Sequence, residues 1–212
     1  MRPELHSLPD VDLSKINDLK WRFFKTARSI CPEWQIAEEH RGIINDIFNW
    51  CLGLDGDLDC HKGLWLWGNN GTGKTTMLKI IKDFSRAIGK RDARGKEYGF
   101  RIVNVPEICG IYEKEGRAGI EQFATLNRQA FDELGAEEII TGHYGTPLNV
   151  MQYILMRRYD GRFDNFTHVT TNLTIEELRD RYGDRVYDRC KEMFNFVYLG
   201  GKSNRKKPFG MD

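Results

Sequence analysis

The stretch "GLWLWGNNGTGKTTMLKIIKDF", Gly63 to Phe84, decides how the rest of the chain is read. Four apolar residues, 64–67, run into a glycine-rich turn that ends in a lysine and two threonines. Apolar residues then recur at helical spacing, at Met77, Ile80, Ile81, Phe84 and Ile88. A strand, a glycine-rich turn and an amphipathic helix in this order predict a phosphate-binding loop.

The turn fits the pattern G-x-x-x-x-G-K-[ST] without adjustment. Its glycines let consecutive backbone N–H groups turn inward around an anion, and the following helix adds the positive end of its dipole. Lys74 is placed to reach the β- and γ-phosphates of ATP, and Thr75 to reach Mg²⁺. The predicted cofactors are ATP and Mg²⁺. The predicted binding residues are Gly68, Asn69, Asn70, Gly71, Thr72, Gly73, Lys74, Thr75 and Thr76.

Composition limits the class of protein. The 212 residues suffice for one α/β domain with a small appendage. Lys and Arg total 32 against 31 acidic residues, so nucleic-acid contacts would have to come from local patches. The five cysteines are scattered without a C-x-x-C pair, which favours reduced thiols in a cytoplasmic protein. Neither a membrane span nor a signal core is visible, so we expect no membrane partner.

Alternating strands and helices predict the fold. Short apolar strands are expected at 64–67, at 101–105, around 130–131, at 166–173 and at 194–200. Strands separated by helices indicate a three-layer α/β fold of the P-loop NTPase type, with a parallel sheet of about five strands. Two helices, expected at 13–30 and 35–52 with Ile36 on the buried side of the second, precede it. We therefore divide the chain into an N-terminal helical extension, 1–60, and an ATPase domain, 61–212.

Polar residues follow two of these strands. Asp132 and Glu133 come directly after Ala130 and Phe131, where a carboxylate can support Mg²⁺ and a second can polarise the attacking water. Asn172 stands at the end of the strand at 166–173, within reach of a γ-phosphate. These residues favour hydrolysis, whereas the loop alone leaves transfer, motion and switching open.

From about Gly63 to Arg205 the sequence resembles the DnaC/IstB-type branch of the AAA+ ATPases, which includes helicase loaders and the ATPases that accompany certain transposases. The motifs that carry the resemblance occur in the family's order. They are "GNNGTGKT", "FDELGAE", "HYG", a helix ending in "RRYD", "TTNLTIEEL", "YGDRVYDR" and "GGKSNR".

The resemblance implies a role for each matched residue. Lys74 and Thr75 would form the Walker A motif, Asp132 and Glu133 the Walker B motif, with Asp132 and Thr75 as metal ligands. Asn172 would be the sensor-1 residue. Arg189 would be an arginine finger that acts in trans on the nucleotide of a neighbouring subunit, with Arg185 as its nearest rival. An ordinary surface ion pair with Asp188 or Glu192 is the alternative for Arg189.

The resemblance also implies partners. The first expectation is a helicase-loader-like replication ATPase, of phage or mobile-element character, which self-assembles with ATP and acts on single-stranded DNA or a DNA-bound replicative helicase. The second is an IstB-like helper that acts with a transposase. Two alternative functions come from other classes of protein: a small P-loop kinase, and a nucleotide-gated binding module without turnover.

Three segments are candidates for DNA or partner contact. The helix at 13–30 mixes aromatic and basic residues, which suits docking into a partner groove, stacking on single-stranded bases, or packing on its own domain. The segment 85–96 carries five cations against one acid, and the tail adds a second basic group. The cations are Arg86, Lys90, Arg91, Arg94 and Lys96 in the first and Lys202, Arg205, Lys206 and Lys207 in the tail.

Overall fold

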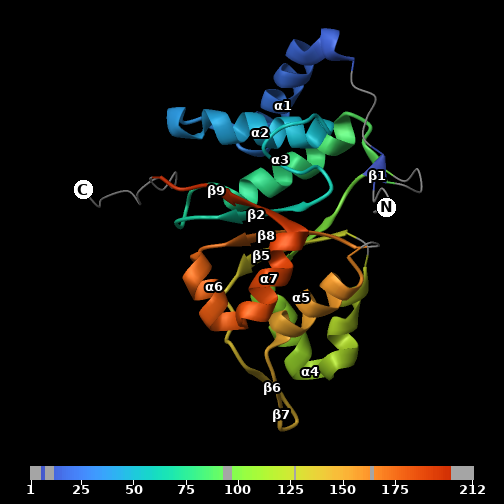
Figure 1. The fold of residues 1–212 in the computed structure, drawn as a ribbon, viewed down its shortest axis with the longest axis vertical. Helices are drawn as coiled ribbons and strands as arrows, with labels where there is room; N and C mark the ends of the chain where they lie inside the picture. Colours follow the sequence, from blue (N-terminus) through green and yellow to red (C-terminus); the bar gives the residue numbers. More distant parts are fainter. Residues whose placement is uncertain (1–5, 8–11, 93–96, 127, 163–164, 202–212) are drawn as a thin grey trace.

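The chain folds around a five-stranded parallel sheet (Figure 1). The computed structural model describes residues 6–7, 12–92, 97–126, 128–162 and 165–201. In sheet order the strands are β4 (Arg101–Asn104), β5 (Arg128–Leu134), β8 (Phe166–Thr171), β2 (Gly63–Trp67) and β9 (Phe194–Tyr198). The predicted α/β fold with about five parallel strands is confirmed.

Helices cover both faces of the sheet, so the fold has three layers (Figure 1). One face carries α1 (Ile16–Ile30), α2 (Arg41–Leu52) and α3 (Lys74–Ala87). The other face carries α4 (Val105–Thr125), α5 (Val150–Asp160), α6 (Ile175–Tyr182) and α7 (Asp184–Met193). Strand β2 serves both cores, because alternate side chains point to opposite faces. Leu64 and Leu66 join the core with α1–α3, and Trp65 joins the core with α4–α7.

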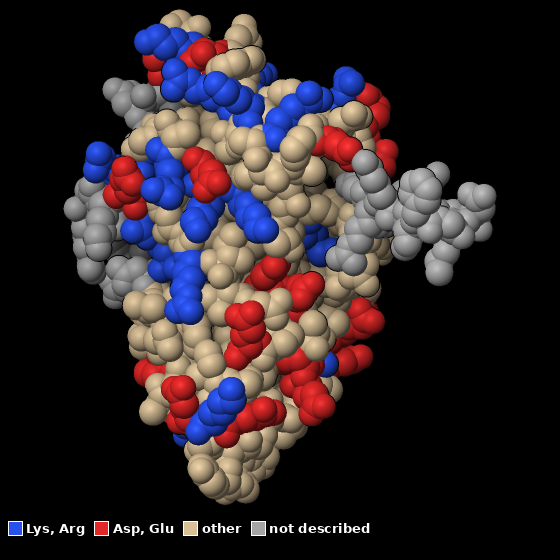
Figure 2. Space-filling model, turned by 180° about the vertical axis from the view of Figure 1, so that it is seen from behind, with Lys and Arg blue, Asp and Glu red and all other residues tan. Residues whose placement is uncertain are grey.

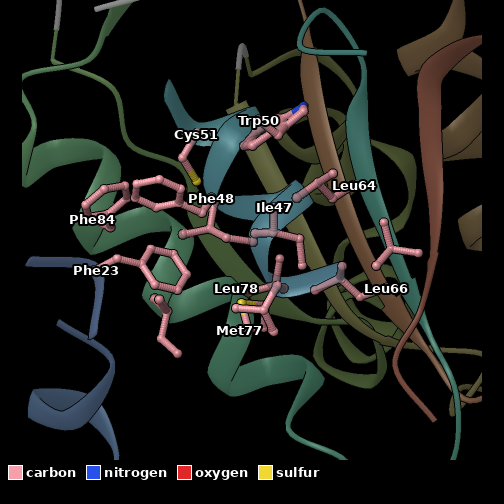
Figure 3. Close-up of a cluster of buried hydrophobic side chains, with 14 of the residues drawn as sticks. Phe23, Ile47, Phe48, Trp50, Cys51, Leu64, Leu66, Met77, Leu78 and Phe84 are labelled. Atoms are coloured by element: carbon pink, nitrogen blue, oxygen red, sulfur yellow. The ribbon is translucent and has the colours of Figure 1, made fainter. Parts of the chain in front are cut away.

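The core between α3 and the sheet explains why the helix after the phosphate loop is fixed (Figure 3). Met77, Leu78 and Phe84 are at most 4% exposed and form one stripe of α3. They pack toward Leu64 and Leu66 of β2 in the same cluster. Burial of these side chains on both sides of the loop holds the loop between two rigid elements.

The two N-terminal helices pack into this same core. Phe23 and Ala27 of α1 are 4% and 0% exposed, and the Phe23 ring meets the Phe84 ring edge-on at a centroid distance of 5.0 Å. On the outer face of α1, Trp21 is 58% exposed and Phe24 is 37% exposed. The inner residues therefore support core packing, while the outer face stays open to a partner.

The second predicted helix begins later than expected. A 3₁₀ turn, Glu38–His40, precedes α2, and Ala37 before it is extended. Because residues 35–37 are not helical, Ile36 does not lie on a buried helix side as predicted and is 36% exposed.

Two features of the fold have no counterpart in the predicted elements. A hairpin of β6 (Thr141–His143) and β7 (Thr146–Leu148) protrudes beside α4, and a short antiparallel pair joins β1 (His6–Ser7) to β3 (Arg91–Asp92) (Figure 1). Gly116 interrupts α4 at φ +63°, where an added Cβ would lie 2.8 Å from the His143 ring. Among the described residues, no helix combines the length and apolar character needed to cross a membrane.

Candidate nucleotide-binding site

The phosphate loop joins the end of β2 to the start of α3. Gly68, Gly71 and Gly73 have φ values of +140°, +79° and +94°, which side chains other than glycine rarely adopt. An added Cβ at Gly68 would also lie 2.3 Å from the Leu199 carbonyl oxygen. The glycines are therefore required by backbone geometry, and they turn the chain so that α3 begins at the loop with its N-terminal N–H groups.

Lys74 brings a positive charge to the loop. Lys74 is 8% exposed, and its ammonium Nζ donates hydrogen bonds to the carbonyl oxygens of Gly68 and Asn69 at 2.7 and 2.6 Å. The Thr72 hydroxyl also donates to the Asn69 carbonyl, at 3.0 Å. The Lys74 ammonium thus lies against the loop that precedes it, where it can contact the oxygens of a phosphate bound in the loop.

Asp132 and Thr75 lie together, although 57 residues separate them in sequence. The Thr75 hydroxyl donates to Asp132 Oδ1 at 2.9 Å. The Thr170 hydroxyl, from the neighbouring strand β8, donates to the same oxygen at 2.5 Å. A hydroxyl and a carboxylate are oxygen ligands of the kind that Mg²⁺ prefers, so this pair fits the metal expected from the sequence.

Glu133 occupies a strained backbone position at a bulge of β5. Its φ is +62°, and the pairing of β5 with β8 shifts register between Phe131 and Leu134. The Glu133 N–H donates to the Thr170 hydroxyl at 2.9 Å, and Asn104 Nδ2 donates to Glu133 Oε2 at 2.8 Å. Strained non-glycine residues concentrate at functional sites. The bulge changes the direction in which the Glu133 side chain points, relative to a regular strand.

Asn104 and Thr170 are site residues that sequence reasoning missed. Asn104 ends β4, where it stands opposite Asp132 in the strand register, and Thr170 lies near the end of β8. Their signal was available in principle, because the carboxyl ends of parallel strands share one edge of the sheet. That rule brings residues at the ends of β4 and β8 close to those at the end of β5 once the strand order is known.

The phosphate loop, Glu133 and the end of β8 line one cleft. The cleft has a volume of about 250 Å³ and includes Lys74, Thr75, Glu133 and Asn172 among its lining residues. The structure thus brings the phosphate loop, the acidic pair and Asn172 to one place. A second hollow of about 660 Å³ adjoins it, because both are lined by Cys31, Gly73 and Thr76. The segment between α1 and α2 forms much of its wall, including Trp34, Gln35, Ile36 and Ala37.

Arg189 lies outside this cleft, on α7. Its guanidinium contacts three residues of α5: Nη1 lies 3.6 Å from Asp160 and 3.2 Å from the Met156 sulfur, and the group stacks over the Tyr159 ring at 4.6 Å. Its side chain is 20% exposed. Arg185, one turn earlier on the same helix, is exposed. The alternative to the finger role was an ion pair with Asp188 or Glu192, and the ion pair that Arg189 forms is with Asp160 instead.

The predicted basic segment at 85–96 is only partly a surface feature. Lys90 is fully buried, with its ammonium over the rings of Trp50 and Tyr98 at 4.5 and 4.8 Å. Burial lowers the pKa of Lys90 to about 8. Lys90 therefore cannot contact DNA. Arg86 and Arg91 are exposed, whereas Arg94, Lys96 and the tail cations at 202–207 lie outside the described residues.

The protein is similar to known proteins in structure. The sequence matches no protein-family model and no curated protein. A protein described as a primosome component from Streptococcus pyogenes serotype M3 aligns with a TM-score of 0.58 at 18% identity, over 85% of this chain and 91% of its own length. The DnaC helicase loader gives 0.57 at 16% identity, over 84% and 98%.

DnaA from Aquifex aeolicus with AMPPCP bound also aligns, with a TM-score of 0.50 at 14% identity, over 77% of this chain and 48% of that one. At such identities the likeness establishes the fold. The predicted resemblance to the AAA+ helicase-loader branch is confirmed at that level.

Proposed function

We propose that the protein is a cytoplasmic AAA+ replication ATPase of the helicase-loader type, which binds and hydrolyses ATP at the cleft around Lys74. The observation that carries the proposal is the meeting of Lys74, Thr75, Asp132, Glu133 and Asn172 at the end of three adjacent strands. A phosphate loop alone would serve any nucleotide-binding protein. The acidic pair and the asparagine beside it are what a hydrolase needs.

Each side chain then has a task in hydrolysis. Lys74 neutralises charge on the β- and γ-phosphates, while Thr75 and Asp132 would hold Mg²⁺. Bound Mg²⁺ would supply charge neutralisation at the phosphates. Glu133 accepts a proton from, or orients, the attacking water. Its hydrogen bond to Asn104 at 2.8 Å restrains the carboxylate before reaction.

The hollow next to the cleft would accept the base and ribose of the nucleotide. It begins at Gly73 and Thr76 of the phosphate loop and extends to Trp34, Ile36 and Ile44. Its lining combines apolar side chains with polar ones such as Gln35 and His40, and ligand sites likewise combine apolar surface with polar groups that fix the orientation of the ligand. Because α1 and α2 frame this hollow, bound nucleotide would contact the N-terminal helices directly.

Assembly would complete the site. We propose that Arg189 or Arg185 of one subunit approaches the γ-phosphate of the next, where a guanidinium stabilises transition-state charge and contributes about 10³ to 10⁵ in rate. The contacts of Arg189 with Asp160 and Tyr159 would have to break for this role, whereas Arg185 is already exposed. Hydrolysis would thus depend on protein concentration.

The outer face of α1 is the proposed contact for single-stranded DNA. On it Lys25 lies over the Trp21 ring at 4.9 Å, and Arg28 lies over the Phe24 ring at 4.8 Å. Figure 2 shows Lys and Arg gathered over the half of the molecule that contains α1 and α3, whereas Asp and Glu gather toward the other half. Exposed rings beside cations suit stacked bases and their phosphates. A DNA-bound replicative helicase, or a transposase for an IstB-like helper, is the proposed protein partner.

Phosphate release measured across protein concentrations, with and without single-stranded DNA, tests this function. We expect turnover per subunit to rise with assembly and to fall at least 100-fold in the variant that lacks the active arginine, Arg185→Ala or Arg189→Ala. Lys191→Ala, on the exposed side of the same helix and paired with Asp188 at 2.7 Å, is the control and should keep wild-type turnover. Turnover per subunit that is independent of concentration and of both arginines would refute the trans arginine. ATP use only with a small-molecule acceptor would favour a kinase.

A further inference from the structure

A buried polar cluster joins the loop after Glu133 to the end of α6. Glu137 has a side chain that is only 2% exposed. Its Oε2 accepts a hydrogen bond from the Gly135 N–H at 2.7 Å, and its Oε1 accepts one from the Tyr182 hydroxyl at 2.5 Å. Arg181 Nε lies 3.5 Å from Oε1, and the Arg181 guanidinium also donates to the Glu137 carbonyl oxygen. We call these three residues, Glu137, Arg181 and Tyr182, the Glu137 cluster.

Stability alone is a weak reason for such a cluster. Burying a charged pair carries a large desolvation cost, and apolar residues of similar volume often serve stability as well or better. What a satisfied buried pair adds is a fixed geometry between the two segments that supply it. Here both carboxylate oxygens and the backbone carbonyl of Glu137 are engaged, so its loop has little freedom relative to α6.

One end of the cluster is the segment that carries Glu133. The Ala136 N–H donates to the Glu133 carbonyl at 3.0 Å, and the Thr171 hydroxyl donates to the Leu134 carbonyl at 2.6 Å. Together with the Gly135–Glu137 bond, these contacts make a tight turn directly behind Glu133. A shift of Glu137 would therefore move the backbone of Glu133 and change the position of the Glu133 carboxylate.

The other end of the cluster is the corner between α6 and α7. Arg181 and Tyr182 are the last residues of α6, and Gly183, at φ +86°, turns the chain into α7. The start of α5 fixes the same corner from the opposite side, because its N-cap residue Asn149 and Gln152 in its first turn donate to the carbonyl oxygens of Arg181 and Tyr182 at 3.3 and 2.8 Å. The helix that starts there carries both candidate arginines.

We propose that Glu137 is a positioning residue that couples the nucleotide site of one subunit to the arginine which that subunit presents to its neighbour. The proposal rests on the proposed trans-acting arginine and extends it. A change at Glu133 moves the turn behind it, the turn moves the Glu137 cluster, and the cluster sets the start of α7. Glu137 itself does not contact the nucleotide.

Mixed assemblies test this coupling. Acceptor subunits carry Arg185→Ala and Arg189→Ala, so they keep an intact cleft but present no arginine. Donor subunits carry Glu133→Gln, so they present arginines but cannot hydrolyse ATP. Phosphate release from the mixture then comes from acceptor clefts completed by donor arginines. A second donor adds Tyr182→Phe, which removes only the hydroxyl that bonds Glu137.

The matched control donor adds Tyr153→Phe instead. Tyr153 makes the same kind of bond, to Glu121 Oε2 at 2.9 Å, between α5 and α4 and away from the α6–α7 corner. Because a hydrogen bond to a charged group is stronger than one between neutral groups, we expect the Tyr182→Phe donor to rescue turnover about tenfold less well than the Glu133→Gln donor. The control donor should rescue fully, and all donors should bind ATP and assemble equally.

Three other outcomes would refute the coupling between the nucleotide site and the arginine. Full rescue by the Tyr182→Phe donor would show that arginine presentation does not need the cluster. Loss of ATP binding or of assembly in that donor, measured by a fluorescent ATP analogue and by light scattering, would show a structural role only. Absence of rescue by the simple Glu133→Gln donor would refute the trans arginine itself, and the coupling would fall with it.

Discussion

Lys90 offers the sharpest prediction about the fold, because a buried ammonium is rare. It is 0% exposed, its Nζ has no hydrogen-bond partner among the residues that the structure describes, and it lies over the Trp50 and Tyr98 rings. Replacing it by methionine keeps a flexible chain of similar length and removes the charge. We expect Lys90→Met to stabilise the protein at pH 7 by at least about 1 kcal/mol, since apolar replacement of buried charge often does so.

The pH dependence of stability gives the size of the contribution that Lys90 makes to the free energy of unfolding. Burial lowers the pKa of Lys90 from 10.5 to about 8, so between these two pH values the unfolded chain binds more protons than the folded chain. The free energy of unfolding that Lys90 controls must therefore rise with pH through this window, by roughly 2 kcal/mol between pH 7 and pH 9.5. The advantage of Lys90→Met over wild type should shrink by the same amount.

Urea unfolding followed by circular dichroism at the two pH values measures this difference. The difference between the two proteins reports Lys90 together with its coupling to Cys51 and Cys60, because burial raises the pKa of both thiols and the Lys90 charge lowers it. Lys79→Met, at an exposed site on α3, is the control and should show no such change with pH. Lys90→Met should also leave DNA affinity unchanged. A variant that is less stable than wild type at pH 7, or an advantage that does not shrink with pH, would refute the reasoning.

Four further substitutions test the site and the two faces of α1. Thr170→Val removes hydroxyl contacts to Asp132 and to the Glu133 N–H, so phosphate release should fall roughly tenfold or more while the affinity for a fluorescent ATP analogue is kept. Asn104→Ala frees the Glu133 carboxylate, and phosphate release without DNA should rise about threefold; an unchanged rate would refute the restraint. Phe23→Ala should lower the unfolding free energy by about 3–5 kcal/mol in urea titrations. Trp21→Ala should leave stability unchanged and weaken single-stranded DNA binding by about 1–3 kcal/mol in fluorescence anisotropy, with affinity falling steeply with salt.

The sequence was sufficient for those parts of the fold that local patterns determine. Runs of apolar, aromatic and β-branched residues predicted β2, β4, β8 and β9, because these residue types favour strands. For β5 only its centre was predicted. It runs from Arg128 to Leu134, and Gln129 within it is 1% exposed, since tertiary packing buries a polar side chain that local propensity would leave in a loop.

Other parts depend on long-range contacts that a local pattern does not contain. The hairpin of β6 and β7 is held by α4, where Tyr112 donates to the Thr146 carbonyl at 3.1 Å and Gly116 leaves room for His143. Asn104 and Thr170 become site residues only through strand order. Lys90 looked like one cation of a surface patch because sequence does not show that a lysine lies beneath two aromatic rings.

Phosphate release from ATP·Mg²⁺ by Glu133→Gln is the most direct test of the central claim, that the cleft around Lys74 hydrolyses ATP. The variant keeps the size of the side chain and removes the carboxylate that activates water. The account predicts that, at a protein concentration where wild type is fully assembled, turnover falls about 100-fold or more while ATP affinity is retained. Wild-type turnover in Glu133→Gln would contradict it.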